Sequence, residues 1–104
     1  MEGIWYARFT SGEMHGEGLA VLHDGKIEGG DPVHTYSGSY QEDGPHVYAN
    51  VRVSPYAGSS VPADITHPVT YFLQGSITGD SARVTGHPDN RPETFVSVEL
   101  RKGE

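Results

Sequence analysis

The chain of 104 residues has the length of one domain, which we assign to residues 1–104, and its formal net charge at pH 7 is −7. The 7 basic residues form no run, so we expect no direct binding to nucleic acid, which requires a clustered basic surface. The sequence shows no secretory signal, no apolar run long enough to span a membrane and no cysteine, so we expect a cytoplasmic protein without disulfides or thiolate metal sites.

Apolar and polar residues alternate along most of the chain with the period of two that is typical of half-buried strands. In the first predicted strand Trp5, Ala7 and Phe9 share one face, which we assign to the interior. The dipeptide Asp24-Gly25 predicts a tight type I′ hairpin between the second and third strands. The predicted strands cover residues 3–10, 18–23, 26–30, 34–41, 46–53, 69–78, 81–86 and 94–101.

The fourth and fifth strands are predicted to form a second hairpin, with a turn over Glu42 to Pro45. The interior face of the fifth strand is predicted to hold Val47, Ala49, Val51 and Val53. Residues 54–68, which include three prolines, are predicted to be the one long irregular connection, with one helical turn at most.

Eight strands joined mainly by short turns either leave two sheet edges exposed or close into a barrel. We predict an all-β fold, an eight-stranded antiparallel up-and-down barrel of the lipocalin-like type.

Glycine is about twice as frequent as in an average protein, with 14 residues. Many of these glycines lie in or beside predicted strands, where glycine permits sharp bending without side-chain clashes. We interpret them as architectural; the alternative is that a ligand approaches the backbone there. The predicted bending positions are Gly16, Gly18, Gly29, Gly30, Gly38 and Gly75. The structural glycine motif of the first half consists of Gly16, Gly18, Gly29, Gly30 and Asp31.

The sequence contains no pattern typical of catalysis or metal binding. The six histidines are dispersed without metal-ligand spacing, and we interpret them as solvent-exposed turn residues. No Gly-x-Ser-x-Gly elbow precedes a helix, and the aromatic residues lack the flanking cations that stacking on single-stranded nucleic acid requires. We therefore predict a protein that is not an enzyme, with no catalytic residues, no metal and no cofactor.

The stretches GIWYARFTS, GEGLAVLHDGKIEGGD, YSG and YQED, in this order, resemble the GrlR family of small negative regulators of type III secretion gene expression. The resemblance covers about the first half of the chain. It implies a homodimeric, lipocalin-like barrel with an apolar cavity that holds a transcriptional activator away from DNA. In the family an exposed Glu-Asp-Glu-Asp tract in a hairpin loop contacts the activator. Glu42 and Asp43 match its first half, whereas Gly44 and Pro45 stand in place of the second.

Three functional hypotheses remain open from the sequence. In the leading one, Glu42 and Asp43 meet a basic patch on a transcriptional activator, although the same residues are also simply favourable in a turn. The second is a carrier or sensor of a small apolar ligand, and the third is a β domain without a preserved role. The residues predicted to line a ligand cavity are Trp5, Phe9, Val47, Val51, Tyr71 and Leu73.

Apolar residues also occupy the outward face of some predicted strands, as at Ile4, Tyr6 and Phe72. Because outward apolar side chains usually need covering, and because the family resemblance implies it, we predict a homodimer.

Overall fold

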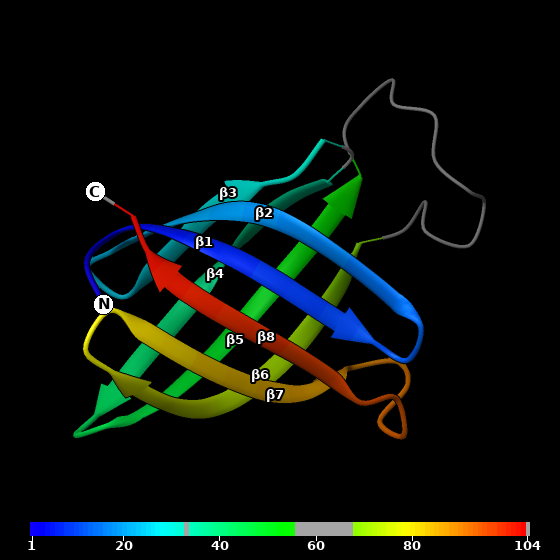
Figure 1. Ribbon diagram of the computed structural model, residues 1–104. Coiled ribbons are helices and arrows are strands. Elements are labelled where there is room, and N and C mark those ends of the chain that lie inside the picture. Colours follow the sequence, from blue (N-terminus) through cyan, green and yellow to red (C-terminus); the bar gives the residue numbers. More distant parts are fainter. Residues whose placement is uncertain (33, 56–67, 104) are drawn as a thin grey trace.

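In the computed structural model, which describes residues 1–32, 34–55 and 68–103, the chain forms a closed barrel of antiparallel strands in sequence order (Figure 1). The strands are β1 (Gly3–Ser11), β2 (Met14–His23), β3 (Lys26–Gly30), β4 (His34–Asp43), β5 (His46–Pro55), β6 (Val69–Thr78), β7 (Ser81–Pro88) and β8 (Val96–Lys102). The barrel closes where β8 pairs with β1, from Trp5 opposite Lys102 to Thr10 opposite Ser97. The predicted eight-stranded up-and-down barrel is therefore confirmed.

The two ends of the barrel differ (Figure 1). The end that we call the turn end holds both termini and the two-residue turns after β2, β4 and β6. The loop end holds the turn after β1 and the connection 89–95 between β7 and β8. At the turn end Asp24 and Gly25 have φ of 52° and 79°, which are the angles of the predicted type I′ hairpin.

Several strands are longer than the sequence pattern predicted. Strand β2 begins at Met14 and not at residue 18, and β7 continues to Pro88. Strand β5 includes Ser54 and Pro55, which we had assigned to the irregular connection, while residues 56–67 of that connection lie outside the described residues. Strand β8 begins at Val96, two residues later than predicted. At the extended ends of β2, β5 and β7 the alternation is weak because glycine, histidine and proline give no clear apolar or polar signal.

The predicted turn over Glu42 to Pro45 is wrong in its extent. Glu42 and Asp43 are the last residues of β4, where they pair with Val47 and His46, and the turn consists of Gly44 and Pro45 alone. Gly44 has a φ of 61°, which favours a two-residue hairpin turn that matches the twist of the two strands.

Two clusters of buried apolar side chains fill the barrel around its middle and toward the turn end. Trp5, with 1% of its surface exposed, is surrounded by the first cluster, and Met1 and Ile77 pack against both clusters. The first cluster consists of Trp5, Ala20, Leu22, Ile27, Tyr40 and Ala82, and the second of Val47, Leu73 and Val84. The side chains predicted to face inward on the first and fifth strands are buried or half-buried, and their neighbours along each strand are mostly exposed, so the predicted alternation is confirmed.

The interior glycines lie where another part of the molecule comes very close. At Gly75 an added Cβ atom would lie 1.8 Å from the carbonyl oxygen of Arg83 on the paired strand. At Gly16 it would lie 2.3 Å from the ring of Phe9, its cross-strand partner, so this ring covers the glycine. Gly29, Gly38 and Gly86 are approached by a backbone oxygen of a neighbouring strand as Gly75 is, within 1.7 to 2.0 Å of the Cβ position. These contacts support the architectural interpretation of the glycines.

Candidate functional site

The outer surface of β1 and β2 exposes four large apolar side chains. Ile4 lies opposite Val21, and Tyr6 lies opposite Leu19. Tyr6 is 58% exposed and each of the other three is 45% exposed. Because directly opposed side chains on one face of a sheet have Cβ atoms about 4.5–5.5 Å apart, the four form one continuous surface, which we call the β1–β2 patch.

A row of alternating charges borders the β1–β2 patch. The strand register places Arg83, Glu99, Arg8 and Glu17 side by side across β7, β8, β1 and β2. Nη2 of Arg8 lies 3.2 Å from Oε1 of Glu17, but both side chains are about two-thirds exposed, so this ion pair contributes little to stability. A groove of about 680 Å³ follows the row. The β1–β2 patch thus has an apolar centre and a charged border, which is typical of surfaces that bind another macromolecule.

The predicted partner-binding residues Glu42 and Asp43 lie at the turn end and differ in their contacts. The carboxylate of Glu42 forms an ion pair with the amino group of Met1. Asp43 is exposed, and its side chain has no hydrogen bond or ion pair within the described residues. Of the two carboxylates, Asp43 is therefore the one that is free to meet a basic partner.

A further carboxylate at the turn end, that of Glu2, was not singled out from the sequence. Its Oε1 atom lies 2.7 Å from Nδ1 of His23, and its Oε2 atom accepts hydrogen bonds from the backbone N–H of Asp24 at 2.9 Å and from the hydroxyl of Tyr40 at 3.1 Å. The backbone hydrogen bond from Asp24, followed by the contact with His23, lowers the pKa of Glu2. Burial, together with the hydrogen bond to Glu2, raises the pKa of Tyr40. These bonds fasten the N-terminal residues to the turn after β2.

At the loop end the last residue of the glycine motif, Asp31, holds the connection between β3 and β4. Its side chain is 6% exposed. Its Oδ1 atom accepts a hydrogen bond from the backbone N–H of His34 at 2.7 Å, and its Oδ2 atom accepts one from the hydroxyl of Tyr36 at 2.5 Å. A carboxylate with several donors of this kind, with its side chain largely shielded from solvent, stabilises the connection.

The six residues predicted to line a ligand cavity all point into the barrel. Trp5, Val47 and Leu73 belong to the two packed clusters. The other three, Phe9, Val51 and Tyr71, are half-buried. Burial raises the pKa of the Tyr71 hydroxyl. The ligand cavity itself stays a prediction.

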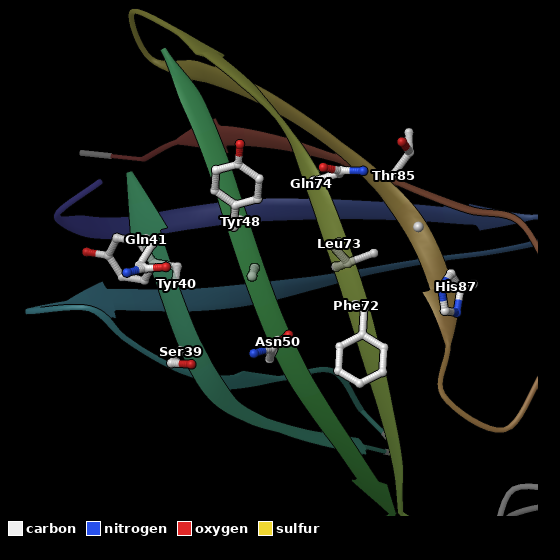
Figure 2. A pocket seen from close by; sticks show the side chains of 12 residues that line it. Ser39, Tyr40, Gln41, Tyr48, Asn50, Phe72, Leu73, Gln74, Thr85 and His87 are labelled. Carbon is white, nitrogen blue, oxygen red and sulfur yellow. The ribbon is translucent and has the colours of Figure 1, made fainter. Parts of the chain in front are cut away.

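A second outer groove, which we call the β4–β7 groove, has a volume of about 390 Å³ and crosses four strands (Figure 2). One register row across it is Gln41, Tyr48, Gln74 and Thr85. The row beside it is Ser39, Asn50, Phe72 and His87. The rings of Phe72 and His87 meet edge to face, with centroids 6.0 Å apart. Sequence reasoning missed this groove; the available signal was a set of uncharged residues at outward strand positions, but only the register shows that they are neighbours.

The prediction that the histidines are turn residues is wrong for all five that the structure describes, because each lies within a strand or at its end, and the predicted exposure fails at two of them. His34 and His87 are half-buried within strands, whereas His15, His23 and His46 are exposed, and His67 lies outside the described residues. Among the residues that the structure describes, no group of three or more His, Asp or Glu side chains could hold a metal ion. The described part of the chain also contains no helix of the length and apolar character that crossing a membrane requires.

Comparison with known proteins adds no family assignment to this small antiparallel barrel. No family model matches the chain, and no curated protein gives a significant match. The resemblance to the GrlR family therefore stays a prediction from the sequence.

Proposed function

We propose that the protein is a non-enzymatic, cytoplasmic regulator that binds a transcriptional activator and keeps it from DNA. The observation that supports contact with a basic partner most directly is Asp43 at the turn end, an exposed carboxylate whose side chain has no hydrogen bond or ion pair within the described residues. The activator as partner rests on the sequence resemblance. A net charge of −7 favours a partner with a basic surface, which a DNA-binding protein has.

The activator hypothesis is tested by affinity capture from the native cell, followed by identification of the captured protein. We expect a sequence-specific DNA-binding protein, and we expect its complex with DNA to dissociate when the purified barrel is added in a mobility-shift assay. A captured protein that binds DNA equally well with and without the barrel would contradict sequestration.

Within this proposal, a second copy of the chain covers the β1–β2 patch. The patch is a continuous apolar surface, because Ile4 and Tyr6 lie directly opposite Val21 and Leu19, and such a surface usually needs covering. Replacing Leu19 by glutamate puts a charge into the patch, where a dimer would have to desolvate it. We expect wild-type protein to sediment as a dimer at micromolar concentration and Leu19→Glu to sediment as a monomer of 11.2 kDa.

The matched control for the dimer is Phe95→Ser, which removes an apolar side chain that is 65% exposed but lies outside the patch. This variant is expected to remain a dimer. Wild-type protein that sediments as a monomer throughout the micromolar range would show that the patch is not a dimer interface.

The acidic pair at the turn end is the surface proposed to contact the activator. Glu42→Ala with Asp43→Ala removes both carboxylates and keeps Gly44 and Pro45, so the turn survives. We expect association with the captured activator to slow by about tenfold at low salt, with a smaller effect at high salt, because screening weakens attraction between exposed charges. Association rates from surface plasmon resonance at both salt concentrations measure this effect.

A single variant shows which of the two carboxylates speeds association. Asp43→Ala alone should slow association almost as much as the double variant, because Glu42 is paired with the Met1 amino group. Asp80→Ala is the matched control, since it removes an exposed acidic side chain from the turn after β6 at the same end of the barrel. If the double variant folds and binds the activator at wild-type rates at both salt concentrations, the contact lies elsewhere on the barrel.

A further inference from the structure

The β4–β7 groove differs from the groove beside the β1–β2 patch in having no charged side chain in its lining. Charged residues make up 20% of the chain, yet none of the twelve residues that line this groove is an Asp, Glu, Lys or Arg. The groove that follows the charged row next to the β1–β2 patch contains arginines and glutamates. A charged ligand would therefore find no counter-charge in the β4–β7 groove, and the ligand that fits it best is neutral.

The groove has a high capacity for hydrogen bonds. The side chains of Gln41, Asn50 and Gln74 each offer both donors and acceptors, and none of them forms a hydrogen bond within the described residues. His87 adds a further group: its Nδ1 atom lies 2.9 Å from the carbonyl oxygen of Pro88 and must donate to it, so Nε2 remains for a ligand. Groups that both donate and accept match hydroxyl groups, which do the same.

Two exposed aromatic side chains stand among these polar groups (Figure 2). Tyr48 is 45% exposed and Phe72 is 44% exposed, and they project from neighbouring strands. Aromatic rings present broad apolar faces, which suit the C–H faces of a sugar ring, while the tyrosine hydroxyl adds a polar tip. Exposed rings bordered by amides and hydroxyls thus offer both kinds of contact that a neutral sugar makes.

The size of the groove also favours a small ligand over a protein. Its volume of about 390 Å³ falls within the range of about 300–1,000 Å³ that small-molecule sites occupy. A stable protein partner would cover about 800 Å² on each side, which is more than such a groove offers. From the neutral lining, the free amides and the exposed rings, we propose that the β4–β7 groove binds a neutral oligosaccharide.

The site shares no strand with the β1–β2 patch, so it can be tested separately from the proposed regulatory function. Isotope-labelled protein is titrated with maltohexaose, cellohexaose and N-acetylchitohexaose at millimolar concentrations, and amide chemical shifts are followed by NMR. We expect at least one of these sugars to shift the amide signals of β4, β5, β6 and β7.

The variants Tyr48→Ala and Phe72→Ala should each weaken binding of that sugar by about tenfold. Phe95→Ala, which removes an aromatic side chain that is 65% exposed and lies outside both grooves and the β1–β2 patch, is the matched control and should leave the affinity unchanged.

Three results would overturn the proposal. The first is the lack of any shift with all three sugars. The second is binding that persists at wild-type affinity in both aromatic variants, whose folding is checked from their own spectra. The third is a heparin hexasaccharide that binds the groove more tightly than the neutral sugars, because a neutral groove offers its sulfate groups no counter-charge.

Discussion

Replacing Gly75 by alanine is expected to unfold the barrel or to lower its free energy of unfolding by about 3 kcal/mol or more. The added Cβ atom would lie 1.8 Å from the carbonyl oxygen of Arg83 and 2.8 Å from the Cα atom of Val84. Both atoms belong to the backbone of β7, so no side-chain rotation relieves the clash. The two strands would have to move apart, which weakens the hydrogen bonds between them and opens the closed barrel. Chemical denaturation followed by circular dichroism measures the loss.

The control for this prediction is Ser76→Ala, one residue further along β6. Ser76 is exposed and points outward, so its replacement should change the free energy of unfolding by no more than about 0.5 kcal/mol. Equal stability of the two variants would show that β6 and β7 separate at this point without cost, and the architectural interpretation of the interior glycines would then be wrong.

The fold could be predicted from the sequence because its signals are local. Alternation places Trp5 and Val47 inside, and Asp24-Gly25 defines a turn without information from the rest of the chain. Eight strands joined mainly by short turns would leave two exposed sheet edges unless the sheet closes into a barrel. The pairing of β8 with β1 confirms this closure.

The strand ends could not be predicted because pairing with a neighbour decides them. Glu42 and Asp43 have turn propensity, but their pairing with Val47 and His46 keeps them in β4. In the same way β2 extends back to Met14 because that residue pairs with Ser11, although the glycines that follow Met14 have low strand propensity.

The surfaces of the candidate sites depend on contacts between residues that are distant in the sequence. Asn50, Phe72 and His87 lie in one row because β5, β6 and β7 pair in a particular register, which no short stretch of sequence specifies. The ion pair of Glu42 with the Met1 amino group likewise joins distant parts of the chain. Sequence reasoning identified acidic residues at the correct hairpin but could not show that one of them has a partner inside the protein.

The second large effect is expected at Trp5, the largest fully buried side chain in the described residues. Trp5→Ala should lower the free energy of unfolding by about 3–5 kcal/mol, because it removes a large apolar group and leaves a cavity. The neighbours Ala20 and Ala82 are too small to fill the space. Urea denaturation followed by far-ultraviolet circular dichroism measures the loss.

Trp5→Phe keeps most of the apolar volume and gives a variant that should remain folded. The indole Nε1 atom of Trp5 is buried without a hydrogen-bond partner within the described residues, so phenylalanine loses packing but no hydrogen bond there. We expect the free energy of unfolding of this variant to fall by about 1 to 2 kcal/mol, well below the loss expected for Trp5→Ala.

If Trp5→Ala instead lowers the free energy of unfolding by less than about 1 kcal/mol, the side chains around Trp5 do not pack closely. The barrel interior would then have space for an apolar ligand, and native mass spectrometry of the wild-type protein should detect a retained molecule, as the carrier hypothesis requires.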